Sequence, residues 1–205
     1  VNPSNLPRTT LSGLFVNIND TCGAVNEDVA SSALLAVNLE GGPGTDCTVP
    51  AGHSSGDTHA SRTGFYEVNR IVEQGKGYLP DNAWLQSQLT SNVNVVDTCN
   101  AFWNGTLNMF RDSGSGCHNT GEIAGVIDHE WGHGMDNNGV NGNISNPGEG
   151  LADVHAILRL QDSCMGRGFF KSGNCGGYGD PGTGWHGSPA ADFAKHVSAG
   201  AGNLS

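Results

Sequence analysis

Two histidines four residues apart constrain the fold of this chain more than any other feature. His129 and His133 lie in the segment H-E-W-G-H, within a stretch whose apolar residues recur at helical spacing. Residues four apart sit one turn apart on the same face of a helix, so both imidazole rings point to the same place. Chance is expected to produce an H-E-x-x-H pattern on the order of 0.01 times in this composition. The pattern indicates a metal-binding helix, with Glu130 beside the ion.

Two histidines leave a metal ion short of ligands, and the next predicted helix offers a carboxylate. This helix starts near residues 146–149, where a proline stands at the first helical position. Glu149 is the leading candidate for the third ligand. Asp153 follows one turn later and is placed to accept a hydrogen bond from a ligand histidine. Asp136, three residues after His133, is the rival third ligand, and a helix-capping role is the alternative interpretation of Glu149.

Glycines in the first of these helices predict close packing. Gly132 and Gly134 each disfavour a helix by about 1 kcal/mol relative to alanine. Another requirement therefore selects them, and a close approach of a neighbouring element near the metal is the expected one.

The rest of the chain indicates an α+β fold. Residues 1–118 are predicted to form a β-rich N-terminal lobe with one long helix at about 58–74, and residues 119–205 a helical metal-binding lobe; together they form one domain. The expected strands lie at 14–16, 34–39, 93–96 and 99–103. Asp57 or Ser61 is the predicted cap of the long helix, and Gly75 and Gly77 mark its expected end.

Six cysteines without a C-x-x-C pair predict disulfides. Spacing cannot select among the 15 possible connectivities, and sequential pairing (22–47, 99–117, 164–175) is expected because each pair closes a short loop. Disulfides are typical of an oxidising compartment, so a secreted, extracellular protein is predicted.

Charge and hydropathy limit the partners. The chain carries nine Lys plus Arg and 20 Asp plus Glu, for a net charge of −11, which disfavours binding to a nucleic-acid backbone. No apolar run approaches the roughly 20 residues of a membrane-spanning helix, so no membrane partner is expected.

Two motifs together resemble the gluzincin zinc metallopeptidases, and the thermolysin and fungalysin group in particular. The first is the H-E-x-x-H helix followed by a Glu that opens the next helix, with an Asp four residues later. The second is N-A-F-W-N-G at residues 100–105, which is similar to the substrate-binding edge strand of thermolysin-like enzymes. The resemblance runs from about residue 57 to 153, half of the chain, and it implies a zincin-like fold with a cleft between two lobes.

The resemblance implies a role for each matching residue. Zinc would bind His129, His133 and Glu149, Glu130 would be the general base and proton shuttle, and Asp153 would hold His129. Asn100 and Ala101 would pair with an extended peptide along the strand that ends at Trp103. For Trp103, packing in the core is the equally weighted alternative.

The chain departs from the family in two ways. The segment between His133 and Glu149 is shorter than in thermolysin and lacks the tyrosine that stabilises the oxyanion there. Tyr178 and His186 are candidates for this role by residue type alone. The residues after the second metal-site helix are too few for the larger helical C-terminal domain of the family, so we expect this lobe to be either reduced or completed by a second polypeptide.

A loop between the two metal-site helices contains candidate calcium ligands, and an ordinary Asn-Gly turn is the alternative interpretation of the same residues. These ligands are Asp136, Asn138, Asn141 and Asn143.

The predicted function is a zinc-dependent endopeptidase that hydrolyses extended polypeptides. The main alternative is an inactive or partner-dependent zinc-stabilised module that binds peptides. An aminopeptidase is a third possibility, but the sequence contains no exopeptidase motif of the G-x-M-E-N kind.

Overall fold

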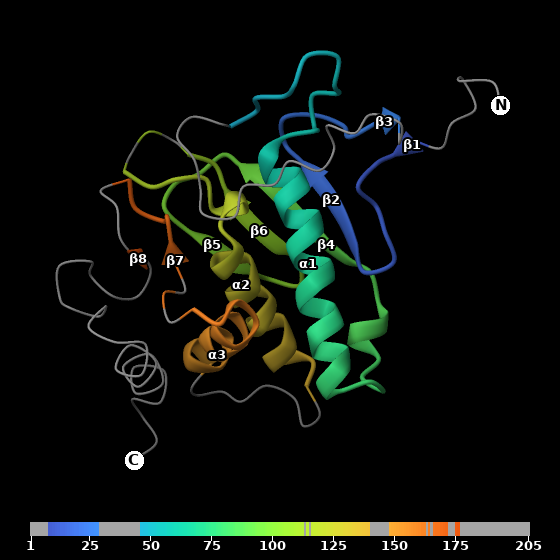
Figure 1. Ribbon diagram of the computed structural model, residues 1–205, viewed down its shortest axis with the longest axis vertical. Helices are drawn as coiled ribbons and strands as arrows, with labels where there is room; N and C mark the ends of the chain where they lie inside the picture. Colours follow the sequence, from blue (N-terminus) through green and yellow to red (C-terminus); the bar gives the residue numbers. More distant parts are fainter. Residues whose placement is uncertain are drawn as a thin grey trace.

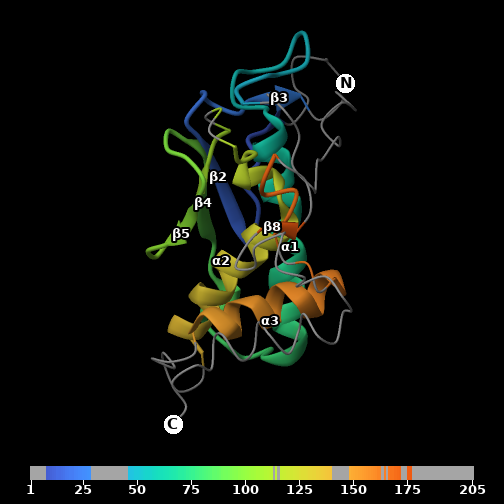
Figure 2. The same ribbon diagram turned by 90° about the vertical axis from the view of Figure 1, so that its left-hand side faces the viewer.

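A four-stranded sheet and three α-helices form the core of the structure. The computed structural model describes residues 8–28, 46–112, 114, 116–139, 148–162, 164, 166–171 and 175–176. Helices α1 and α2 lie on the same side of the sheet, and α3 packs against α2 (Figures 1 and 2). The predicted α+β class is confirmed at this level.

The sheet has the strand order β2-β4-β6-β5. Its strands are β2 (Val16–Asp20), β4 (Leu89–Val95), β6 (Leu107–Phe110) and β5 (Ala101–Trp103). The pairs β2–β4 and β4–β6 are parallel, whereas β5 runs antiparallel to β6. Among the described strands β5 therefore lies at an edge, as predicted. Strand β6 was not predicted, and the strand expected at 34–39 falls outside the described residues.

Short elements complete the described chain. They are β1 (Arg8–Thr9) paired with β3 (Glu27–Asp28), β7 (Gly166–Arg167) paired with β8 (Cys175–Gly176), and the 3₁₀ turns η3 (Trp84–Gln86) and η4 (Thr120–Glu122).

Helix α1 (His59–Tyr78) is longer than predicted. Its N-cap is Thr58, whose hydroxyl accepts a hydrogen bond from the backbone of Ser61, so neither expected cap was right. Of the two glycines expected to mark its end, Gly75 lies within the helix, whereas Gly77 directly precedes its last residue, Tyr78. A Cβ at Gly75 would lie 2.7 Å from the ring of Trp131, so this glycine allows α1 and α2 to approach closely.

Helices α2 (Ala124–Asn137) and α3 (Gly148–Leu160) correspond to the two predicted metal-site helices. Asn119 caps η4, where its side chain accepts a hydrogen bond from the backbone of Gly121. Helix α2 is almost entirely buried because it contacts the sheet and α1 as well as α3. No helix in the described ranges is long and apolar enough to cross a membrane.

Two of the predicted disulfides are confirmed. Cys22 is bonded to Cys47, and Cys99 to Cys117. Cys164 is disulfide-bonded as well, and the side chain of Cys175, its predicted partner, lies outside the described part of the chain.

A buried carboxylate joins the sheet to the start of α1. Asp20, at the end of β2, accepts hydrogen bonds from the hydroxyls of Thr58 (2.5 Å) and Ser61 (2.6 Å). The side-chain amide of Asn94 and the backbone N–H of Cys22 donate to the same carboxylate. These five residues, here called the Asp20 network, fix the end of the sheet against the helix.

Candidate metal centre

The two histidines of α2 face each other on its surface. The Nε2 atoms of His129 and His133 are 3.1 Å apart, and the ring centroids are 4.7 Å apart. This is the arrangement expected for residues one helical turn apart. Both rings therefore direct a nitrogen toward the same point.

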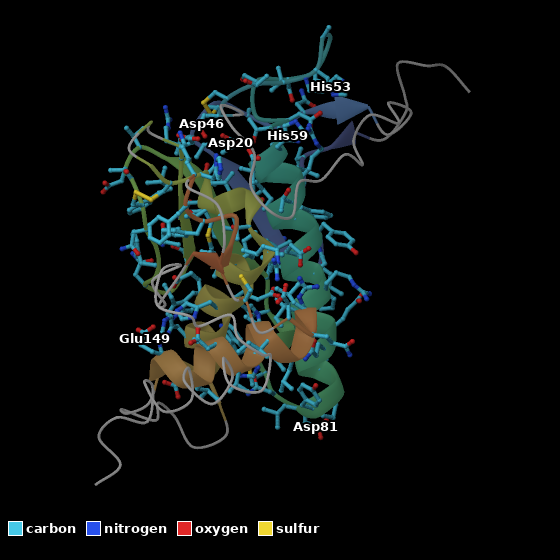
Figure 3. All side chains as sticks on the ribbon, turned by 60° about the vertical axis from the view of Figure 1, so that its left-hand side comes forward. Asp20, Asp46, His53, His59, Asp81 and Glu149 are labelled. Carbon is cyan, nitrogen blue, oxygen red and sulfur yellow. A yellow bond between two sulfur atoms is a disulfide. The ribbon has the colours of Figure 1, made fainter. Side chains whose placement is uncertain are left out.

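Glu149, in the first turn of α3, brings its carboxylate to that point. One oxygen lies 3.2 Å from Nε2 of His129 and the other 3.5 Å from Nε2 of His133. The ligand atoms of these three residues all lie within 4.8 Å of one another. Figure 3 shows Glu149 on α3, in a different part of the molecule from Asp20 and Asp46. Among the described residues, the rival Asp136 does not join this group.

The donor set fits a divalent metal ion such as zinc. Two imidazole nitrogens and one carboxylate match a three-ligand zinc site with a fourth position left for water or substrate. Side-chain exposure rises from 3% at His129 to 23% at His133 and 53% at Glu149. The candidate centre is therefore anchored in the interior and open to solvent on one side.

Asp153 orients the inner histidine. Its carboxylate lies 2.8 Å from Nδ1 of His129, and both side chains are buried. A carboxylate can only accept here, so the partner assigns the proton of the neutral ring to Nδ1 and leaves the Nε2 lone pair facing Glu149. This is the role that the one-turn spacing of Glu149 and Asp153 predicted.

The glycines of α2 account for the close approach of its neighbours. A Cβ at Gly132 would lie 2.6 Å from Cα of Ala152 on α3, and a Cβ at Gly134 would lie 2.7 Å from the ring of Trp84. Real Cβ atoms do not come so close to backbone, so Gly132 sets the distance between the two metal-site helices. The predicted close packing at both glycines is confirmed.

Glu130 lies between the histidines and the edge strand. Its side chain is buried, and the backbone N–H of Trp103 donates a hydrogen bond to its carboxylate. Burial raises the pKa of Glu130 above its ordinary value, whereas positive charge on the two histidines lowers it. The Glu130 carboxylate is thus held beside the strand by a contact from the strand backbone.

The predicted substrate-binding residues differ in their surroundings. Asn100 is exposed and Ala101 is buried in the sheet. The Asn100 carbonyl accepts a hydrogen bond from the hydroxyl of Thr120, which fixes the start of the edge strand. The indole of Trp103 packs edge-on against Trp84, with ring centroids 5.8 Å apart.

Negative charge around His129 governs its protonation in the metal-free protein. Burial lowers the pKa of His129, but hydrogen bonds to Asp153 and Glu149 outweigh this effect and raise the pKa to about 10. At neutral pH the metal-free ring therefore carries a second proton besides the one on Nδ1, and a metal ion would have to displace it.

Several predicted residues cannot be placed. Tyr178 and His186, the oxyanion candidates, lie outside the described residues, as do Asn141 and Asn143 of the calcium prediction.

Sequence reasoning missed three features around the centre. Trp84 and the contact from Trp103 to Glu130 depend on which loops meet in space, and no local spacing signals them. A buried ion-pair cluster of Glu67, Asp128 and Arg159 was also missed. Its signal was available, because Asp128 lies within the apolar run before His129, where a charge needs a partner.

Comparison with known proteins adds no relative. No protein-family model matches the chain, and no curated protein matches it at a significant level. The chemistry of the centre therefore has to be judged from its own side chains.

Proposed function

We propose that this chain is a zinc-dependent endopeptidase of the gluzincin type, with a zincin-like fold. The observation that carries the proposal is the meeting of His129, His133 and Glu149 at one point, with Glu130 beside them and an edge strand alongside. The candidate ligands, Glu130 and the edge strand each have their own role in peptide hydrolysis. Packing of the hydrophobic core requires none of these roles.

The chain's own residues supply the acid–base chemistry. Zinc, when bound, is a Lewis acid that polarises a substrate carbonyl and makes water more acidic. The Glu130 carboxylate takes a proton from the attacking water and passes it to the leaving amine. The contact from Trp103 keeps this carboxylate oriented, and Asp153 keeps His129 in the tautomer that presents Nε2.

Strand β5 is the proposed docking site for the substrate backbone. Among the described strands it pairs with β6 alone, so its other edge is available to an extended peptide, which would add a strand to the sheet. Because Trp103 ends this strand and contacts Glu130, a peptide bound there would run beside the base. We include in this proposal the predicted division of the domain into two lobes near residue 118.

The proposal includes secretion, which the disulfides support. Cys22–Cys47 and Cys99–Cys117 form and persist in oxidising environments. The substrate class is therefore extracellular polypeptide in an extended conformation.

Replacing the proposed base tests the mechanism. Glu130→Gln is expected to retain zinc, because all three proposed ligands remain, and to lose hydrolysis of casein by about 10²–10⁴-fold, the usual effect of general-base catalysis. Zinc content is measured by atomic absorption and turnover by release of soluble peptides. An N-terminally blocked peptide as substrate distinguishes endopeptidase from strict aminopeptidase action.

Two outcomes would contradict the proposal. Casein hydrolysis at the parent rate in Glu130→Gln would exclude this residue as the base. A parent protein that binds zinc and an extended peptide without cleaving any substrate would match the non-catalytic peptide-binding module instead. Dependence of turnover on zinc is checked by chelator treatment and by return of the metal.

A further inference from the structure

A buried cluster of three charged residues joins the helices of the metal centre. The guanidinium of Arg159 on α3 donates through Nε to Asp128 on α2 and through Nη2 to Glu67 on α1. Side-chain exposure is 12% for Arg159, 1% for Glu67 and 0% for Asp128. We call these three residues the Arg159 cluster. Through these two ion pairs the side chain of Arg159 joins α1, α2 and α3.

The cluster shares a surface of α3 with the metal-site residues. At 3.6 residues per turn, Glu149, Asp153 and Arg159 fall within an arc of about 120° around the helix. Ala152, which touches Gly132, belongs to the same arc. Arg159 lies about 15 Å along the axis from Glu149, so α3 is fixed at its far end by charge and near its middle by backbone contact.

Rotation of α3 about its own axis is the movement that this arrangement prevents. Side-chain tips lie about 6 Å from a helix axis, so a rotation of about 10° moves them by about 1 Å. A shift of that size matters at a metal centre, because ligands have to be held within about 0.5 Å of their working geometry. Glu149 is half exposed, so packing in the core holds its side chain on one side only.

Ion pairs at this position are better explained by orientation than by stability. Burying charges costs desolvation energy, and apolar side chains of similar volume stabilise a core equally well. An arginine fork, by contrast, fixes two carboxylates in a defined direction. Charged groups in the core between α1, α2 and α3 thus specify how the helices face one another.

We infer that Arg159 is a positioning residue for the metal centre: with Glu67 and Asp128 it sets the rotation of α3 that brings Glu149 and Asp153 to the histidines of α2. The inference rests on the proposed zinc site and extends it to residues that touch neither metal nor substrate.

Metal binding by the full 205-residue chain tests the inference without any activity assay. The main variant is Glu67→Gln/Asp128→Asn/Arg159→Met, which leaves no buried charge without a partner and so avoids unfolding for that reason. A second variant, Arg159→Lys, keeps the charge and loses the fork. Arg70→Met is the matched control, because it removes an exposed ion pair with Glu73 elsewhere on α1.

Zinc affinity, measured by competition with a chelator, is expected to fall about tenfold in the triple variant, the lower end of the effect of outer-shell residues. It is expected to fall less in Arg159→Lys and not at all in Arg70→Met. The visible absorption of the cobalt-substituted protein reports ligand geometry, and it is expected to change in the two cluster variants alone. Thermal unfolding of each metal-free protein shows whether the variants are folded.

The outcomes separate the two proposals. A parent protein that binds neither zinc nor cobalt overturns the proposed function, and the positioning role with it. A parent that binds zinc, together with folded cluster variants that keep its zinc affinity and cobalt spectrum, overturns the positioning role alone. Loss of affinity with an altered spectrum in both cluster variants supports it.

Discussion

The Asp20 network and the candidate metal centre are two polar clusters that meet opposite requirements. In the Asp20 network one carboxylate is surrounded by donors from Thr58, Ser61, Asn94 and the Cys22 backbone. In the metal centre the groups that meet are two imidazole nitrogens and a carboxylate, whose lone pairs point at one another.

The difference teaches how to tell a structural polar cluster from a functional one. Asp20 needs nothing further, because buried acceptors that meet donors are satisfied. Acceptors that meet acceptors are satisfied only when a proton or a cation lies between them. In the metal-free protein a proton on His129 meets this requirement in place of the ion, and the raised pKa of His129 reflects it.

Removing the Asp20 carboxylate should have the largest effect on stability. Asp20→Ala leaves the buried donors of Thr58, Ser61 and Asn94 without their acceptor, and each unsatisfied group costs about 1–3 kcal/mol. We expect the free energy of unfolding to fall by about 3 kcal/mol, measured by urea denaturation of the metal-free protein. Zinc affinity of the folded variant should stay unchanged.

Asp81→Ala is the matched control, because Asp81 is exposed at the opposite end of α1 (Figure 3). Its effect on the free energy of unfolding should stay within about 0.5 kcal/mol. A loss of zinc affinity in Asp20→Ala equal to its loss of stability would show that the two centres are coupled and break the comparison.

Replacing Glu149, the half-exposed candidate ligand, should have the opposite effect to Asp20→Ala: a large loss of zinc affinity and a small loss of stability. Glu149→Gln is expected to weaken zinc binding by about 100-fold, at least as much as loss of an outer-shell residue. The free energy of unfolding of the metal-free protein should fall by no more than about 1 kcal/mol, since the residue is largely in solvent and the variant loses only the contact that helps to keep His129 protonated. Isothermal titration with zinc and urea denaturation measure the two effects.

Asp136→Asn is the control for the choice of third ligand. It keeps the size of the side chain and removes the rival carboxylate, so zinc affinity should remain close to that of the parent. The opposite result, with Asp136→Asn losing zinc and Glu149→Gln retaining it, would transfer the ligand role to Asp136.

The pH dependence of the metal-free protein should show the smallest effect. A histidine whose pKa is raised by folding stabilises the protein fully below pH 6.5, and this contribution is lost as the pH rises toward about 10. Raising the pH from 7 to 8 should therefore lower the free energy of unfolding by about 1 kcal/mol. The zinc-loaded protein should lack this loss, because zinc binds the neutral ring. Equal pH profiles with and without zinc would argue against a metal at His129.

Sequence reasoning succeeded where a local rule sufficed. Helical spacing placed His129 and His133 together, and it put Asp153 one turn from Glu149. Short loops between cysteines predicted Cys22–Cys47 and Cys99–Cys117.

Sequence reasoning failed where tertiary contacts override a local signal. Gly75 looks like a helix stop, yet it lies within α1. A glycine is needed at this position because the ring of Trp131 occupies the space of a side chain. Strand β6 has only four residues, L-N-M-F, and so short a segment cannot be assigned to a strand by periodicity alone. The Arg159 cluster depends on which faces of three helices meet, and this is set by the packing of the whole core.

The backbone contact at Gly132 also bears on how the centre is assembled. Gly132 and Gly134 alone weaken the intrinsic helicity of α2 by about 2 kcal/mol in total, and a helix of 14 residues is marginal in water even with a favourable sequence. The histidine pair is therefore not preformed on an isolated segment. We expect it to take shape when α3 docks and Ala152 packs over Gly132, so a metal ion bound there would follow folding and would not nucleate it.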